Sequence, residues 1–210
     1  MSPHPLAPVV ALDIDGTEAD YHGHFTWFAE MWTGRKMPDP ADINPGKPLY
    51  KHLGMSRQTY RECKLAFRQG GMKRSMPAYE GFADLVKHMR KTGAQVWFCT
   101  TRPYLRLDNV DPDTRHWFRR NGVHAYDGLI YGNSKYRHLV RIVGEERVLM
   151  VVDDLPEMVD QSLRLQLPTI LRDQPYNKHY SHPANWWRAF NNQDIKEMFD
   201  DLWRRKTDGH

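Results

Sequence analysis

The sequence has few cysteines and no long apolar run. Only Cys63 and Cys99 occur in 210 residues, they show no metal-ligand spacing, and one disulfide would be an unusual way to stabilise a chain of this size. No run of about 18 apolar residues exists. Residues 1–5 lack the basic and apolar regions of an export signal. We therefore expect a soluble, cytoplasmic protein with no membrane segment.

Strong charge of one sign is also absent. The net charge is +4, and no run of five or six basic residues occurs. The densest basic cluster is 204–206, which we interpret as a solvated end. A mild positive excess favours the approach of anionic small molecules such as nucleotides. It does not indicate a dedicated nucleic-acid partner.

Internal repeats and low-complexity segments are missing, and what is present is an alternation of short apolar runs with amphipathic stretches. This pattern is typical of parallel strands joined by crossover helices. It predicts an α/β fold: a three-layer, Rossmann-like open parallel sheet with helices on both faces. We expect the first two strands to be neighbours, in a sheet formed by residues 8–12, 95–99, 128–131, 147–152 and 168–171.

One segment interrupts the alternation between the first two predicted strands. Residues 20–76 read as two helices, the first with Phe25 and Phe28 on its apolar face and the second running from about Ser56 to Gly70. We interpret the segment as a small helical cap inserted after the first strand. The predicted organisation is a catalytic core of residues 1–19 and 77–210 with a cap of residues 20–76.

Several polar residues follow directly on apolar runs. Ligands of open α/β sheets bind beyond the carboxyl ends of the strands. Asp13, Thr100 and Asp153 each come at such an end. The fold prediction therefore brings these three residues to one edge of the sheet.

Asp13 and Asp15 form the most informative pair. In an extended chain, residues at i and i+2 point to the same side, and two adjacent carboxylates repel each other unless a cation or a proton relieves the charge. Mg²⁺ prefers such oxygen ligands. The competing interpretation is an acidic surface turn.

The segment Asp13-Ile14-Asp15-Gly16-Thr17 resembles the first motif of haloacid dehalogenase (HAD)-type phosphatases, Asp-x-Asp-x-Thr after a hydrophobic strand. The resemblance implies a HAD-like fold and a Mg²⁺ cofactor. It also implies that Asp13 attacks phosphorus to give an aspartyl-phosphate, while Asp15 serves as general acid and then base.

The other motifs of these phosphatases appear in the same order. Thr100 matches the hydroxyl that donates to the phosphoryl group, and Lys135 matches the basic residue that neutralises the nucleophile and the phosphate. Asp153 and Asp154 match the acidic motif; we favour Asp154 for the metal, with Asp13 and the backbone carbonyl of Asp15. Further phosphate contacts are expected from Thr101 and Arg102.

Within these phosphatases the chain resembles the 5'(3')-deoxyribonucleotidases of bacteria and phages over most of residues 8–190. The residues that carry this likeness are 100–103, Thr114, Trp117-Phe118, 126–128, 132–135, 174–177 and Trp186-Trp187. The resemblance implies a nucleoside monophosphate substrate, with a deoxyribose sugar favoured. Cap aromatics would then stack on the base: Trp27, Phe28 and Trp32. The competing interpretation is that cap aromatics, Phe25 and Phe28 above all, form the core of the cap itself.

Two other functions stay open. One is a phosphatase of nucleic-acid 3' ends, which the absence of a basic stripe disfavours. The other is a catalytically silent module that binds nucleotides or docks a partner, which the retained acidic residues and Lys135 disfavour. The C-terminal stretch 195–203 has helical spacing, and we expect it to dock on the domain, with a homodimer contact as the alternative.

Overall fold

The computed structural model describes residues 6–44, 47–103 and 109–208. Its centre is a six-stranded sheet of order β3-β2-β1-β4-β5-β6, in which every pairing is parallel. The predicted α/β class, the five predicted strands and the pairing of the first two are confirmed. The strands are β1 (Val9–Leu12), β2 (Gln95–Thr100), β3 (Gly128–Tyr131), β4 (Val148–Asp153), β5 (Thr169–Arg172) and β6 (Trp187–Ala189). β6 was not predicted, because three residues with a central arginine make no apolar run.

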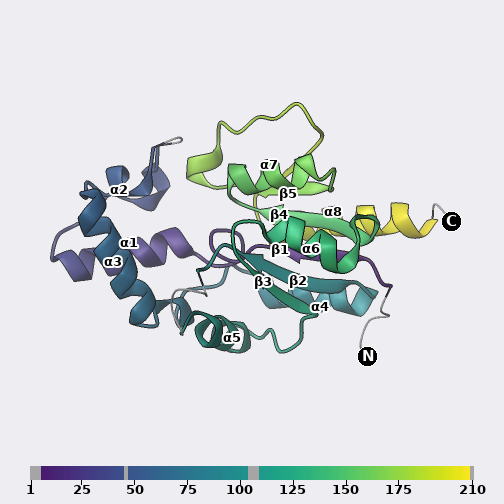
Figure 1. Ribbon diagram of the computed structural model, residues 1–210, viewed down its shortest axis with the longest axis horizontal. Helices are drawn as coiled ribbons and strands as arrows, with labels where there is room; N and C mark the ends of the chain where they lie inside the picture. The colour runs from purple at the N-terminus through teal and green to yellow at the C-terminus, as the bar shows by residue number, and fades with distance from the viewer. Residues whose placement is uncertain (1–5, 45–46, 104–108, 209–210) are drawn as a thin grey trace.

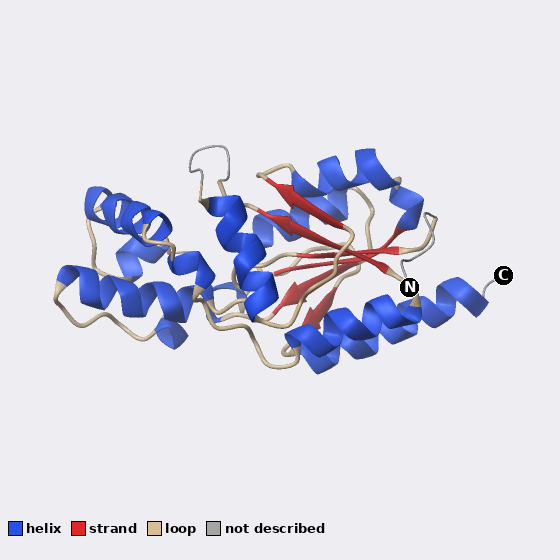
Figure 2. Cartoon of the chain, turned by 90° about the horizontal axis from the view of Figure 1, so that it is seen from below, coloured by secondary structure: helices blue, strands red, loops and turns tan. Residues whose placement is uncertain are grey.

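Helices connect the strands and cover both faces of the sheet, which Figure 2 shows nearly edge-on. Side chains alternate along β1. Val10 and Leu12 pack with the helices Phe82–Thr92 and Asn192–Asp208, while Val9 and Ala11 pack with the helices Lys135–Val143 and Pro156–Arg164. The helices of the core are α4 (Phe82–Thr92), α5 (Val110–Arg120), α6 (Lys135–Val143), α7 (Pro156–Arg164) and α8 (Asn192–Asp208). The three-layer arrangement follows from apolar residues on both faces of the strands.

The insertion after β1 forms a helical group at one end of the molecule, left in Figure 1. It contains α1 (Tyr21–Thr33), α2 (Leu49–His52), α3 (Arg57–Gln69) and the short 3-10 helices Pro40–Asp42 and Met72–Arg74. Ser56 caps the start of α3, as the sequence indicates, and Gly34 ends α1 in a left-handed conformation. The one-turn helix α2 lies between the two helices that the sequence predicts for this segment.

The interior of the cap is continuous with that of the core. Phe25 of α1 and Phe67 of α3 are buried and stack edge to face at 5.3 Å between ring centroids. Both belong to the same buried cluster as Val10 and Leu12 of β1. The division at residues 19/20 and 76/77 stays a prediction, but the shared cluster fixes the cap helices against the sheet end that carries Asp13.

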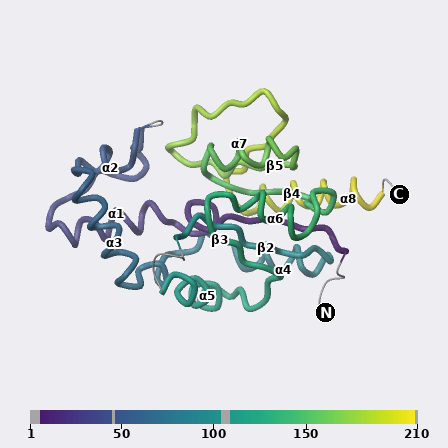
Figure 3. The backbone as a smooth tube through the Cα atoms, viewed as in Figure 1, coloured from purple at the N-terminus to yellow at the C-terminus, as the bar shows by residue number. Residues whose placement is uncertain are grey.

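The C-terminal helix docks on the core, as predicted. Ile195 and Phe199 of α8 are fully buried in the cluster that covers one face of the sheet. The chain between β5 and β6 passes beside α7, as the tube in Figure 3 shows, and Trp186 packs there with Val159 and Leu163. In the described part of the chain, no helix combines the length and the apolar character needed to cross a membrane.

Candidate active site

Asp13 lies at the carboxyl end of β1, in the centre of the sheet. Its amide donates to the carbonyl of Val152 at 2.9 Å, which continues the pairing of β1 with β4 and fixes the backbone there. Asp13 is buried, and its carboxylate accepts from Lys135 Nζ. Lys135, the first residue of α6, is fully buried and also pairs with Asp153 Oδ2 at 2.6 Å.

Three buried carboxylates meet at this point. Asp13, Asp153 and Asp154 each offer an oxygen, and these oxygens all lie within 4.8 Å of one another. Burial raises the pKa of Asp13 to about 7, with Lys135 opposing and Asp153 adding to the shift. Burial, and then the charges of Asp13 and Asp153, raise the pKa of Asp154 above its ordinary value. Each negative charge thus raises the free energy needed to ionise the other carboxyl groups, and a bound cation lowers it.

The cluster fits a hard divalent cation. All three side chains offer carboxylate oxygens, the donor type that Mg²⁺ and similar ions prefer. Lys135 partly neutralises Asp13 and Asp153. Burial alone would lower the pKa of Lys135, but these two carboxylates outweigh it and raise that pKa above its ordinary value. Asp154 has no cationic partner within the described chain, so a bound metal ion would stabilise its ionised form more than that of the other two carboxylates.

Asp154 is nevertheless oriented by hydrogen bonds. Thr17 Oγ1 donates to its Oδ1 at 2.9 Å, and the Tyr176 hydroxyl donates to its Oδ2. Gly16 has φ +97° at the adjacent turn, and a Cβ atom there would lie 2.4 Å from Asp154 Oδ2 and 2.8 Å from the Tyr176 hydroxyl. Only glycine therefore fits this position of the motif.

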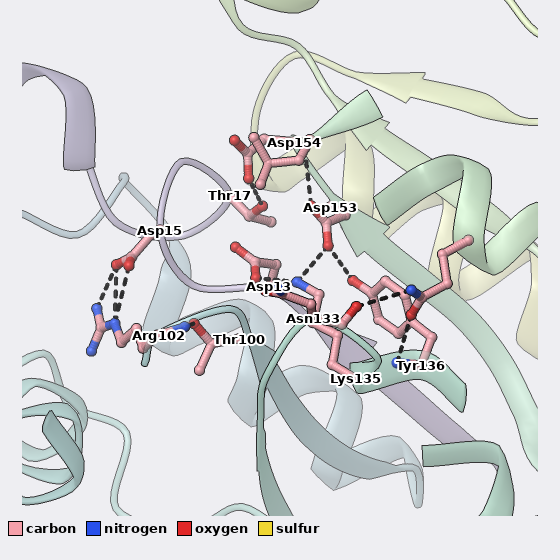
Figure 4. Close-up of polar contacts among 12 residues, drawn as sticks. Asp13, Asp15, Thr17, Thr100, Arg102, Asn133, Lys135, Tyr136, Asp153 and Asp154 are labelled. Carbon is pink, nitrogen blue, oxygen red and sulfur yellow. Dashed lines mark hydrogen bonds and ion pairs between the residues drawn. The ribbon is translucent and has the colours of Figure 1, made fainter. Parts of the chain in front are cut away.

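Asp15 does not join the cluster. Its carboxylate points toward Arg102, away from Asp13 (Figure 4). Arg102 Nη2 donates to Oδ1 at 2.6 Å, Arg102 Nε donates at 3.1 Å, and Lys73 Nζ pairs with Oδ2. Burial would raise the pKa of Asp15, but Arg102 and Lys73 outweigh it and hold that pKa far below its ordinary value. The expectation from i, i+2 spacing, that both carboxylates lie on the same side, is not met.

The residues that follow β2 border the site. Thr100 is fully buried, and its Oγ1 accepts from the Arg102 amide at 3.3 Å, while Thr101 lines the neighbouring cavity. Arg102 is also buried and donates to Thr114 Oγ1 at 2.8 Å. Its guanidinium, predicted to bind phosphate, is thus occupied with Asp15 and Thr114.

A cavity of about 200 Å³ opens between the cap and the core. The core supplies Asp15, Thr101, Arg102, Pro103, Asp154 and Leu155, and the cap supplies Tyr21, His22, Leu49, Tyr60, Lys64, Arg68 and Lys73. The cavity therefore joins the carboxylate cluster to a wall of cap residues that carries several positive charges.

The aromatic residues predicted to bind a base lie elsewhere. Trp27, Phe28 and Trp32 do not line the cavity. Trp27 and Trp32 are exposed, at 47% and 42%, and Phe28 packs on the buried cluster, 5.3 Å from Phe67 between ring centroids. Tyr21 and His22 reach the cavity from the first turn of α1. Phe28 and Trp32 lie about two and three turns further along the helix, and Trp27 lies on another face.

Sequence reasoning missed several residues of the site. Tyr176 lies in a segment noted only for its likeness to the deoxyribonucleotidases, and Thr17 completes the first motif without an assigned role. Tyr136, next to Lys135, donates to Asp153 Oδ2. Lys73 comes shortly after Gly70-Gly71, where no sequence pattern marks it as functional, so only its contact with Asp15 reveals it.

Comparisons with known sequences find distant relatives. No model of a known protein family matches the chain. A candidate nucleotidase of Oceanobacillus iheyensis is 24% identical over 103 residues, which cover 49% of this chain and 53% of that protein, so the match spans about half of that relative. A candidate 5'(3')-deoxyribonucleotidase of Chlorobaculum tepidum is 23% identical over 197 residues, covering 90% of this chain and 89% of that protein.

Solved structures share the fold. A hydrolase of the haloacid dehalogenase-like family from Streptococcus pneumoniae superposes with a TM-score of 0.66 at 12% identity, over 93% of this chain and 100% of that one. A phosphatase predicted in Clostridium acetobutylicum superposes with a TM-score of 0.65 at 14% identity, over 95% and 99%. The chain therefore has the HAD-like fold and resembles phosphatases built on it.

Proposed function

We propose that this chain of HAD-like fold is a metal-dependent phosphomonoester hydrolase that uses Asp13 as its nucleophile. The observation that carries the proposal is the buried cluster of Asp13, Asp153 and Asp154 with Lys135 at the centre of the sheet edge. A surface turn rich in acids would leave these side chains in water, whereas here all four residues are buried, each at most 3% exposed as a whole residue. Burying such charges costs folding free energy, which a catalytic role explains.

Asp13 would attack phosphorus through its carboxylate and form an aspartyl-phosphate, with the nucleoside oxygen as leaving group. Lys135 holds the carboxylate in place and opposes the negative charge that accumulates on the phosphoryl group. Thr100 and Thr101 stand at the end of the neighbouring strand, where their hydroxyls would donate to phosphoryl oxygens. These roles make the step one of positioning and electrostatics, as is usual in phosphoryl transfer.

Asp13, Asp154 and the backbone carbonyl of Asp15 would hold Mg²⁺. When bound, the ion would lower the pKa of Asp13 and add positive charge beside the phosphate. Asp153 would serve mainly to position Lys135, since its Oδ2 accepts from both Lys135 and Tyr136.

Asp15 would protonate the leaving oxygen and then activate water for hydrolysis of the aspartyl-phosphate. In the present arrangement Arg102 and Lys73 keep it ionised and directed away from Asp13. Proton donation therefore requires that these contacts loosen when substrate is bound, so that the carboxylate can take up a proton near the leaving oxygen.

Nucleoside monophosphates are the proposed substrates. The support is the naming of both curated relatives as candidate nucleotidases and the cavity between cap and core, which lies beside Asp15 and Asp154. Tyr21, His22 and Tyr60 are the cap rings at this cavity, and we propose them for base contacts in place of Trp27, Phe28 and Trp32.

We expect the activity in the cytoplasm, with no membrane or nucleic-acid partner. A homodimer stays an open alternative.

The test is a phosphate-release screen over all ribo- and deoxyribonucleoside monophosphates, with 5' and 3' isomers, in Mg²⁺ and in EDTA. We expect release that needs the metal and falls about a thousandfold or more in Asp13→Asn, because the nucleophile is removed. Asp84→Asn is the matched control, since Asp84 is exposed on α4, away from the cavity. Full turnover by Asp13→Asn would refute the proposal.

The screen also separates the alternatives. Nucleotide binding without release of phosphate from any phosphomonoester would favour the silent binding module. Salt-sensitive affinity for oligonucleotides with release of their 3' phosphates would favour the nucleic-acid phosphatase.

A further inference from the structure

One wall of the cavity carries two cations that catalysis as proposed does not use. Lys64 and Arg68 lie one turn apart on α3 and both line the cavity, with Tyr60 one turn before them. Lys64 Nζ lies 5.3 Å from the centroid of the Tyr60 ring. The three side chains thus form a stripe along the cap side of the cavity, facing the sheet edge that carries the carboxylate cluster.

Lys64 and Arg68 differ from the other cations of the cavity in their partners. Within the described residues, neither side chain forms an ion pair or a hydrogen bond, although both are partly buried. The other cations of the cavity, Lys73 and Arg102, share the carboxylate of Asp15. Asp15 is therefore already neutralised, and the positive charge of Lys64 and Arg68 remains in excess.

Such an arrangement is unfavourable without a ligand. Like charges four residues apart on a helix repel each other, and partial burial adds to the cost. Burial, followed by the charge of Arg68, lowers the pKa of Lys64 to about 8. A bound anion would reverse both effects, since it would supply the missing countercharge and hydrogen-bond acceptors.

The phosphate that reacts is not that anion. It must lie against Asp13 and Lys135, which do not line the cavity and sit deeper at the sheet edge. Lys64 and Arg68 line the cavity from the cap, on the other side from the core residues Asp15 and Arg102. An anion at Lys64 and Arg68 would therefore belong to another part of the same substrate.

Resting on the proposed phosphatase function, we propose that Lys64 and Arg68 bind a second anionic group, a phosphate or a carboxylate, on the leaving group of the substrate. The preferred substrates would be phosphomonoesters with an anion at both ends, such as nucleoside bisphosphates. The planar fork of Arg68 suits paired oxygens, and Lys64 adds a point charge.

Matched pairs of substrates test this assignment. Adenosine 5'-monophosphate is compared with adenosine 3',5'-bisphosphate, ribose 5-phosphate with ribose 1,5-bisphosphate, and glycerol 3-phosphate with 3-phosphoglycerate. The first two pairs add a phosphate to a nucleoside or to a sugar, and the third adds a carboxylate. We expect kcat/KM to be about tenfold or more higher for the member with the second anion in at least one pair, mainly through KM.

The variants Lys64→Gln and Arg68→Gln should each remove most of that preference. Arg61→Gln is the matched control, since Arg61 is exposed on the same helix and does not line the cavity; its preference should equal that of the unmodified protein. Far-ultraviolet circular dichroism of each variant checks that α3 is retained.

Three outcomes are distinguishable. Hydrolysis with equal kcat/KM for both members of every pair would overturn the second-anion site and leave the phosphatase function intact. A preference that survives in Lys64→Gln and Arg68→Gln would also overturn it. If no probe releases phosphate, the phosphatase function fails, and calorimetry of the same pairs with the unmodified protein then tests the anion site alone. Tighter binding of the doubly anionic member, lost in the two variants, would support the site. Equal binding of both members would refute it.

Discussion

Arg102 donates two hydrogen bonds to the carboxylate of Asp15, from Nη2 at 2.6 Å and from Nε at 3.1 Å, and this carboxylate points away from Asp13 (Figure 4). The Arg102 side chain is only 1% exposed, and the remaining nitrogen of its guanidinium donates to Thr114. Arg102, which was predicted to bind phosphate, thus orients Asp15, which was predicted to transfer the proton. The pair connects the turn after β1 to the turn after β2.

Breaking this pair should destabilise the protein. In Arg102→Gln the buried charge of Asp15 keeps only Lys73, so we expect the free energy of unfolding to fall by about 2–4 kcal/mol. Urea denaturation at pH 7 measures the change. Arg119→Gln, exposed on α5, should change the value by about 0.5 kcal/mol or less. An equal effect of the two substitutions would contradict the importance of the pair.

Gly16→Ala should disturb Asp154. An added Cβ atom would approach Asp154 Oδ2 to 2.4 Å in a backbone of φ +97°. We expect a loss of about 1–3 kcal/mol in stability, together with weaker binding of Mg²⁺. Gly34→Ala is the matched control: its φ is +68°, but nothing lies within 4 Å of the place that the new Cβ atom would take. Calorimetry should therefore show weakened metal binding in the first variant alone.

Asp154→Asn should weaken divalent-cation binding by about tenfold or more, because one of three clustered carboxylates loses its charge. Titration calorimetry with Mg²⁺ and Mn²⁺ gives the dissociation constants directly, without reference to activity. Asp160→Asn, on α7 and outside the cluster, serves as the control. Unchanged affinity in Asp154→Asn would remove this residue from the metal site.

His22 should make stability depend on pH. Burial, followed by the charge of Lys64, lowers the pKa of His22 from 6.5 to about 4. Between these two values the unfolded chain binds a proton at His22 that the folded protein does not. The free energy of unfolding should therefore fall as pH drops from about 6.5 to 4, by up to about 3 kcal/mol.

Denaturation series across this pH window test the assignment. His22→Gln should show a flatter profile than the unmodified protein, because its side chain does not titrate there. His138→Gln, at an exposed position on α6, should keep the original slope. Parallel profiles for the unmodified protein and His22→Gln would show that another group controls the dependence.

The carboxylate cluster was predictable from the sequence because its members depend on short-range patterns. Each apolar run ends in a polar residue, and parallel strands bring their carboxyl ends to one edge. Asp13 and Asp153 therefore had to approach once β1 and β4 paired. Lys135 begins the helix after β3, so the connection from that strand carries it to the same edge.

The sequence by itself determined the α/β class, the strand ends and the identity of the buried acids, since these follow from local periodicity. The tertiary structure decided the rest. Helical spacing identifies the faces of α1 but not which face meets the core, so Tyr21 and His22 reach the cavity while Trp27 does not. Lys73 meets Asp15 across 58 positions of the sequence, and only the folding of the cap onto the sheet, which depends on long-range packing, brings such residues together.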